Sequence, residues 1–202
     1  MTPELERPPA LPGANAQFVT DRLAVGGDLD MYDEGLAARQ VAALTNAGIS
    51  HVLDVREEWS DEEIWAQVPG VTYHWDGIDD AGQRVPVDWF EGIVTWALSA
   101  LEDPAARILA HCHMGINRGP SAGFAILLGL GWEPIEALDA IRRARPIAFV
   151  AYADDALRWH HAKTGANAEE RLRDRARLEI WRHDHDLDIA TVIRRIRTQE
   201  GQ

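Results

Sequence analysis

The single cysteine of the chain, Cys112, lies among side chains that suit nucleophilic chemistry. Gly115 and Arg118 follow it in the segment 112–118, and Pro120 lies just beyond that segment, after Gly119. A loop of this length that leads into a helix can surround an anion with backbone N–H groups, and the helix dipole adds partial positive charge. The same field stabilises a thiolate, which is the nucleophilic form of cysteine. The segment therefore predicts attack by sulfur on a bound oxyanion.

The competing interpretation is a buried structural cysteine with an arginine nearby by chance. Arginine is common here, because all of the 20 basic residues except Lys163 are arginine. Gly115, which permits unusual backbone dihedrals, and His111 directly before the cysteine make coincidence the weaker explanation. The apolar run 107–110 before the cysteine also predicts a buried strand, and Pro120 suits the first turn of a helix.

The predicted elements alternate between strands and helices, which is typical of an α/β fold. We expect a central, mainly parallel sheet flanked by helices, followed by a C-terminal helical appendage. Ser60 and Glu63 have the spacing of a capping box, and Asp88 is placed to cap a later helix. The predicted strands cover 22–27, 49–55, 71–75 and 107–110, and the predicted helices cover 35–47, 88–101, 120–130, 134–145 and 153–162.

Composition narrows the class of protein. A chain of 202 residues with 46% hydrophobic content can bury one full core. Its formal net charge of −13 argues against a nucleic-acid partner, since phosphate-backbone affinity comes mainly from clustered basic residues. The apolar runs are too short for a membrane span, and the N-terminus lacks the pattern of a signal peptide. We therefore expect a cytoplasmic protein without a membrane or nucleic-acid partner.

Two histidine clusters raise the question of a metal site. His111 and His113 flank Cys112, and His183 and His185 lie among acids. Zinc sites usually take ligands from two separated pairs, a spacing that neither cluster has. We expect no metal and no other cofactor.

The segment from His111 to Ser121 resembles the active-site signature of the cysteine-based protein tyrosine phosphatase superfamily, in its dual-specificity branch. The shared pattern is His-Cys, five residues and Arg. The resemblance extends from about Phe18 to Trp159 and implies a catalytic domain over 17–165. The four prolines of residues 1–16 predict an extended segment, and the changed composition of residues 166–202 predicts a helical appendage. Stripes at Leu172, Ala176 and Ile180, and again from Ile189, predict that the appendage packs on the body or forms a homodimer.

The resemblance implies a mechanism for these residues. Cys112 would attack phosphorus and form a phosphocysteine that water hydrolyses, with a lowered thiol pKa and with Arg118 holding phosphate oxygens. Asp80 is implied as general acid, by its spacing to Phe90, and Asp79 remains a rival. The phosphate loop, whose N–H groups bind the phosphate, consists of His113, Met114, Gly115, Ile116, Asn117 and Arg118.

Supporting roles remain open at three positions. The resemblance implies that His111 hydrogen-bonds to the loop and tunes the thiol, but a core histidine is equally consistent with the sequence. The family usually has Ser or Thr after the arginine, whereas this chain has Gly119. Ser121 either takes over that hydroxyl role or stabilises the helix start.

These inferences lead to a metal-independent phosphomonoester hydrolase. The resemblance favours a protein phosphatase of dual tyrosine and serine/threonine specificity. Two alternatives stay open, namely a catalytically slow module that recognises phosphorylated partners and a phosphatase for a small, non-protein phosphate ester.

Overall fold

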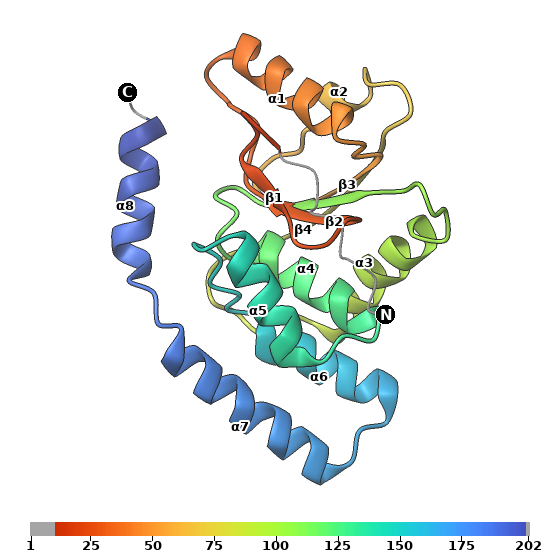
Figure 1. The fold of residues 1–202 in the computed structure, drawn as a ribbon, viewed down its shortest axis with the longest axis vertical. Helices are drawn as coiled ribbons and strands as arrows, with labels where there is room; N and C mark the ends of the chain where they lie inside the picture. Colours follow the sequence, from red (N-terminus) through yellow and green to blue (C-terminus); the bar gives the residue numbers. More distant parts are fainter. Residues whose placement is uncertain (1–10, 201–202) are drawn as a thin grey trace, which may run out of the picture.

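Five strands form one sheet in the order β1-β2-β5-β3-β4 in the computed structural model, which describes residues 11–200 (Figure 1). Neighbouring strands β2, β5, β3 and β4 run parallel, and the edge strand β1 pairs antiparallel with β2. The predicted α/β fold with a mainly parallel sheet is confirmed. The strands are β1 (Ala16–Phe18), β2 (Leu23–Gly26), β3 (His51–Arg56), β4 (Thr72–Ile78) and β5 (Ile108–His111).

Helices cover both faces of the sheet (Figure 1). On one face, α1 and α2 enclose a smaller core with Trp65 and Leu44, and on the other α3 to α6 enclose the main core with Phe90 and Phe124. The central helix α4 is buried over almost its whole length. These helices are α1 (Glu34–Asn46), α2 (Glu62–Trp65), α3 (Val87–Ala100), α4 (Arg118–Gly129), α5 (Pro134–Ala144) and α6 (Ala153–Thr164).

Strand β5 and helix α4 position the cysteine segment. β5 lies in the middle of the sheet, and all four of its residues are buried. The segment between β5 and α4 therefore emerges at the carboxyl edge of the parallel strands, where α/β proteins commonly bind ligands. Both elements are held by the main core, so the loop between them has a rigid support.

Two local predictions were wrong, and one strand was missed. The first turn of α2 follows Asp61, whose side chain makes no capping bond, so the predicted capping box at Ser60 does not form. Helix α3 begins at Val87 after Pro86, which places Asp88 inside the first turn rather than at the cap. Strand β1 was not predicted, because its three residues carry too little pattern to separate from the lead-in.

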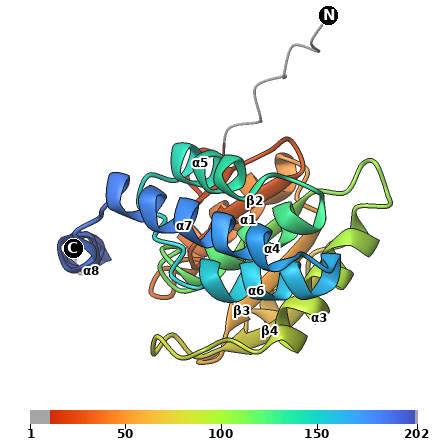
Figure 2. The ribbon, with the colours of Figure 1, turned by 90° about the horizontal axis from the view of Figure 1, so that it is seen from below.

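The C-terminal region forms two helices, α7 (Ala168–Asp184) and α8 (Ile189–Glu200). Figures 1 and 2 show α7 running along the body and α8 standing beside it at an angle to α7. Helix α7 packs on the body through Leu178 and Trp181, which belong to the main core. The predicted stripe is not its packing face, since Leu172 is 69% and Ile180 is 62% exposed.

Residues 1–10, most of the predicted extended segment 1–16, lie outside the described residues. Within the part that is described, no helix combines the length and the apolar character needed to cross a lipid bilayer.

Candidate active site

The loop from Cys112 to Arg118 folds tightly against the glycine turn that ends β2. The N–H of Cys112 donates to the carbonyl of Gly26 at 3.2 Å, and the N–H of Asp28 donates to the carbonyl of His113 at 2.8 Å. Gly115 has φ of +64°, and a Cβ there would lie 2.5 Å from the carbonyl carbon of Gly26. Both the left-handed dihedral and the close approach require glycine, as the sequence predicted.

A buried arginine from outside the loop holds its carbonyl groups. Arg145 is 2% exposed, and its Nε donates to the carbonyl of Gly115 at 2.6 Å while Nη2 donates to that of Met114 at 2.9 Å. It also donates to Asn15 and Gln17 near β1. Burial lowers the pKa of Arg145 to about 10, and the charge is kept at neutral pH. Arg145 therefore ties the loop to the edge of the sheet.

The segment after α5 supports the other half of the loop. The N–H of Phe149 donates to the carbonyl of Ile116 at 2.7 Å, and the N–H of Ala151 donates to Oδ1 of Asn117 at 2.7 Å. Between them Val150 adopts φ of 54°, a left-handed conformation that is costly for a β-branched residue. The loop is thus braced from two sides before any ligand arrives.

The guanidinium of Arg118 is oriented by a carboxylate from the loop after β3. Nη1 and Nη2 donate to the two carboxylate oxygens of Glu58 at 2.7 and 2.8 Å, and Nη1 also donates to the carbonyl of Ile78 at 2.9 Å. Among the described residues, the buried Nε of Arg118 has no hydrogen-bond partner. An arginine has five N–H donors in a planar fork, so Nε–H and one N–H of Nη2 remain for an oxyanion.

Asp80 contacts the phosphate loop next to Arg118. Its Oδ1 accepts from Nδ2 of Asn117 at 2.6 Å and from the hydroxyl of Tyr152 at 3.2 Å, and its Oδ2 lies 3.5 Å from Nε of Arg118. The carboxylate of Asp79 instead accepts from the N–H of Asp80 at 2.7 Å within its own turn. Of the two candidate acids, Asp80 is the one in contact with the phosphate loop.

A cavity of about 390 Å³ brings the predicted residues together. Cys112 and Arg118 line it together with Asp80, and loop residues His113 to Asn117, apart from Gly115, complete that side. The volume lies within the range of about 300 to 1,000 Å³ that is usual for small-molecule sites. The larger cavity, of about 590 Å³, lies next to it and shares His113 and Met114.

The thiol of Cys112 differs from the expectation. Burial raises the pKa of Cys112, and the N–H groups of Gly119 and Gly115 together with the charge of Arg118 offset this only in part. A lowered pKa was predicted because loop N–H groups and a helix terminus favour the thiolate. Desolvation of this side chain, which is 2% exposed, outweighs them.

The raised pKa gives a testable pH dependence. The thiolate fraction should be small at pH 7 and increase about tenfold for each pH unit, because the thiol loses its proton only above its ordinary range. We expect the rate constant for alkylation of Cys112 by iodoacetamide to increase steadily from pH 6 to pH 9. A rate that levels off below pH 7 would show that the thiol pKa is lowered instead.

His111 does not hydrogen-bond to the loop, which corrects the first of its two interpretations. It is 2% exposed, and neither ring nitrogen has a hydrogen-bond partner among the described residues. Burial lowers its pKa, so the ring is neutral, and Nε2 lies 3.8 Å from Oδ2 of Asp54. His111 is therefore a buried core histidine at the end of β5.

Beside it, a buried acidic cluster surrounds Arg56. This guanidinium pairs with Asp28 at 2.8 Å, with Asp54 at 2.5 Å and with Asp61 at 2.7 Å. Atoms of Asp54, Asp61 and His111 lie close enough together to hold a metal ion. Nη2 of Arg56 pairs with both Asp54 and Asp61, so a guanidinium supplies the positive charge there. The arrangement is therefore a buried ion-pair network.

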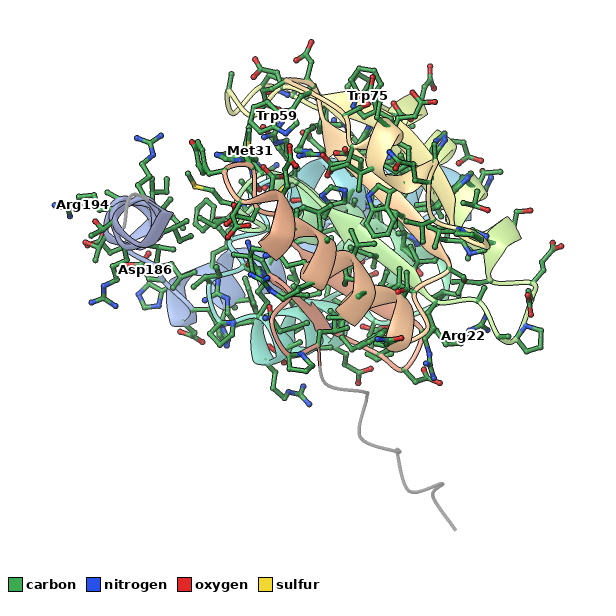
Figure 3. All side chains as sticks on the ribbon, turned by 90° about the horizontal axis from the view of Figure 1, so that it is seen from above. Arg22, Met31, Trp59, Trp75, Asp186 and Arg194 are labelled. Atoms are coloured by element: carbon green, nitrogen blue, oxygen red, sulfur yellow. The ribbon has the colours of Figure 1, made fainter. Side chains whose placement is uncertain are left out.

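His113 links this cluster to the loop. Its Nδ1 lies 2.6 Å from Oδ2 of Asp28, and its ring packs edge-on against Trp59, which is labelled in Figure 3. The side chain of His113 is therefore held by Asp28, which also pairs with Arg56 in the buried network.

Gly119 and Ser121, which follow Arg118, have structural explanations. A Cβ at Gly119 would lie 3.0 Å from the backbone of His111, so α4 approaches β5 too closely for the usual Ser or Thr without a shift. The hydroxyl of Ser121 is buried and donates to Oδ1 of Asn117 at 3.4 Å. This contact favours the interpretation that Ser121 stabilises the helix start.

Glu58 was missed by sequence reasoning, and its role is testable. Replacing Glu58 with glutamine removes one of the acceptors that fix Arg118, so we expect kcat/KM for an aryl phosphate to fall about tenfold, the effect of one charged hydrogen bond. Glu57→Gln, at an exposed neighbouring position, is the matched control. If both variants retain the activity of the unmodified protein, Glu58 does not position Arg118.

Comparison with known proteins was made on sequence and on structure. No protein-family model and no curated protein matches the sequence. Among solved structures, Tk-PTP in its active form is 24% identical, with a TM-score of 0.57 over 71% of this chain and 94% of that chain. Human DUSP28 is 19% identical, with a TM-score of 0.61 over 78% and 99%.

The structure of PTPMT1 in complex with PI(5)P is 16% identical, with a TM-score of 0.61 over 75% of this chain and 97% of that chain. At these identities the likeness establishes the fold. Each neighbour is matched over almost its whole length, whereas part of this chain has no counterpart in the neighbour. The unmatched part is long enough to include the C-terminal helices. The chain therefore has the fold of the cysteine-based protein tyrosine phosphatases, of the dual-specificity type.

Proposed function

We propose that this protein hydrolyses phosphate monoesters through a phosphocysteine intermediate on Cys112. The observation that carries the proposal is the shared cavity, in which the buried sulfur, the open edge of Arg118 and the carboxyl group of Asp80 line one space. The braced loop supports an oxyanion site, as does the Nε–H of Arg118, which makes no hydrogen bond within the described part of the chain. Preorganised donors of this kind are the main source of catalysis in phosphoryl transfer.

The proposed first step transfers the phosphoryl group to sulfur. The thiolate of Cys112 forms a bond to phosphorus while the bond from phosphorus to the ester oxygen breaks. Asp80, in its protonated form, gives its proton to the departing oxygen, so an alcohol or phenol leaves. Arg118 holds two equatorial oxygens through Nε and Nη2.

The second step restores the enzyme. Water attacks phosphorus, Asp80 takes a proton from that water, and the bond between sulfur and phosphorus breaks to give inorganic phosphate and the thiolate of Cys112. No metal or cofactor is required in either step. Asp80 thus acts first as general acid and then as general base.

For the substrate, the resemblance extends the proposal to phosphorylated tyrosine and serine or threonine side chains. A small phosphate ester undergoes the same chemistry at sulfur, and PTPMT1, a structural neighbour, was crystallised with PI(5)P. Homodimer formation through the C-terminal helices remains part of the proposal, with the exposed Leu172 and Ile180 of α7 as the apolar surface.

The test is hydrolysis of p-nitrophenyl phosphate by the purified full chain in the presence of a metal chelator. We expect turnover that vanadate inhibits competitively, because vanadate adopts the geometry of the transition state. A protein that releases no p-nitrophenol under these conditions, at any pH between 5 and 9, contradicts the proposal.

A second candidate is a module that binds phosphorylated partners and turns them over slowly. One observation favours it, namely Gly119 in place of the usual hydroxyl residue that assists breakdown of the intermediate. Such a module would bind a phosphotyrosyl peptide tightly, and phosphocysteine would accumulate during the assay. Mass spectrometry of the protein quenched in acid during turnover distinguishes the two functions.

A further inference from the structure

Helix α8 carries a stripe of side chains that faces the catalytic cavity. Ile189, Ile193 and Arg197 recur at intervals of four residues, so they lie on one side of the helix. All three line the same cavity as Cys112 and Arg118. A helix far from the motif in sequence therefore forms one wall of the proposed active site.

Apolar side chains from other segments line the same cavity as α8. Met114 and Ile116 come from the phosphate loop, and Phe149 comes from the segment that braces it. With Ile189 and Ile193 they give the cavity an apolar lining beside Cys112 and Arg118. An apolar leaving group, such as an aromatic ring, would bury its surface against these side chains.

The base of α8 is fixed to the body beside the loop. His185, just after α7, stacks on Trp181, and its carbonyl accepts from Nη1 of Arg142 at 2.9 Å. Arg182 donates to the carbonyl of Ala151 at 3.2 Å, next to the residues that support the loop. These contacts fix the C-terminal end of α7 on the body, a few residues before α8 begins.

Helix α8 contributes none of its described residues to either hydrophobic core. Its side-chain hydrogen bonds in the described region stay within the helix and its N-terminal turn, where Thr191 bonds to Asp188 and Arg194 bonds to Ala190. Ile189 and Ile193 are partly buried, while Arg194 is exposed and points away from the body in Figure 3. Substitutions on the inner stripe should therefore change how α8 borders the cavity without disturbing the core.

Arg197 extends this border to the neighbouring cavity. It lines both cavities, and the larger one also includes Met31, which Figure 3 shows on the flank of the body nearest α8. A polypeptide that carried a phosphorylated side chain into the site would have to pass α8 on one side of the phosphorylated residue. A compact ester has no chain that must pass the helix.

We propose that α8 is a specificity wall that favours small phosphate monoesters with an apolar leaving group over phosphorylated proteins. The inference rests on the proposed function and narrows its substrate class. Ile189 and Ile193 contact the leaving group, and the helix obstructs the peptide on one side of the phosphorylated residue.

The test compares kcat/KM for p-nitrophenyl phosphate and for a phosphotyrosyl decapeptide in the full chain. The unmodified protein should prefer the small ester. In the double variant Ile189→Ser with Ile193→Ser, the ratio should shift towards the peptide by about tenfold or more, a change of about 1.4 kcal/mol, because the smaller side chains obstruct the peptide less while both aromatic esters lose the same apolar contact. The control is Ala190→Ser with Arg194→Ser, which has the same spacing on the exposed side and should leave the ratio unchanged.

A second variant tests the proposal in case the serine substitutions unfold α8. Ile193→Trp enlarges the wall, so it should raise KM for naphthyl phosphate more than KM for phenyl phosphate, by about fivefold to tenfold. Equal KM changes for the two esters, or an unaltered ratio in the serine double variant, overturn the specificity wall.

The two proposals can fail separately. Cys112-dependent hydrolysis of p-nitrophenyl phosphate with an unaltered ratio in the serine variant supports the proposed function and overturns the role of α8. A peptide preference in the unmodified protein also overturns the role of α8. Absence of hydrolysis for every ester overturns the function and, with it, the inference that depends on it.

Discussion

Replacing Cys112 with serine is expected to lower kcat for p-nitrophenyl phosphate by a factor on the order of 10⁴ to 10⁶, as for other covalent nucleophiles. Serine nearly matches cysteine in size, and the side chain is 2% exposed, so the fold should be unchanged. A serine hydroxyl is a far weaker acid than a thiol, so it remains protonated and is a poor nucleophile in this loop. Steady-state kinetics of the purified variant, with circular dichroism to compare its folding, measures the effect.

Oxyanion binding provides the control for this variant. The loop N–H groups and Arg118 do not depend on sulfur, so Cys112→Ser should bind tungstate with a Kd within about threefold of the unmodified protein. A variant that keeps one tenth of the original kcat would place the nucleophile elsewhere. A variant that loses both tungstate binding and its folded spectrum reports on stability and calls for Cys112→Ala.

Asp80→Asn is expected to have the second largest effect, and it depends on the leaving group. For phenyl phosphate, whose leaving oxygen needs a proton, kcat should fall by about 10² to 10³, the usual contribution of a general acid. For p-nitrophenyl phosphate the fall should be smaller, because that phenolate leaves without full protonation. Stopped assays with both esters at one pH give the comparison.

Asp79→Asn is the matched variant one residue away. The carboxylate of Asp79 is engaged within its own turn, whereas that of Asp80 contacts Asn117 and Tyr152. We expect Asp79→Asn to change kcat for phenyl phosphate by less than about threefold, an effect below 1 kcal/mol. A strong loss in Asp79→Asn together with an unaffected Asp80→Asn would reverse the assignment of the acid.

The phosphate loop could be predicted from the sequence because its requirements are local. A buried strand, a cysteine, Gly115 and the first turn of a helix follow one another in the chain, and each has its own residue pattern. The structure places them as expected, with Gly115 in the left-handed region and Pro120 in the first turn of α4. The mainly parallel sheet follows from the alternation of strands and helices, whereas the strand order was not predicted.

The residues that hold the loop could not be predicted, since they come from distant segments. Glu58 follows β3, Arg145 ends α5 and Tyr152 precedes α6, and each resembles an ordinary polar side chain in its own segment. Tyr152 contacts the loop of Asp79 and Asp80, and burial raises its pKa to about 12. In a chain this rich in arginine, Arg145 in particular carries no signal until its buried partners are known.

The pKa of Cys112 is the clearest case in which pattern and structure differ. The sequence shows the groups that favour a thiolate, but it does not show how far the sulfur is removed from water. Desolvation acts on every buried ionisable group and depends on packing from the whole fold. The same reasoning applies to His111, whose position next to the cysteine suggested a role that its surroundings do not support.

The account depends most on the oxyanion cup formed by the loop. A crystal structure of the full chain with vanadate or tungstate tests it most directly. We predict that the ion lies over Sγ of Cys112, that Nε and Nη2 of Arg118 donate to it, and that Glu58 still holds the far edge of the guanidinium. An empty cup at saturating oxyanion, or an ion bound away from the sulfur, would contradict the account.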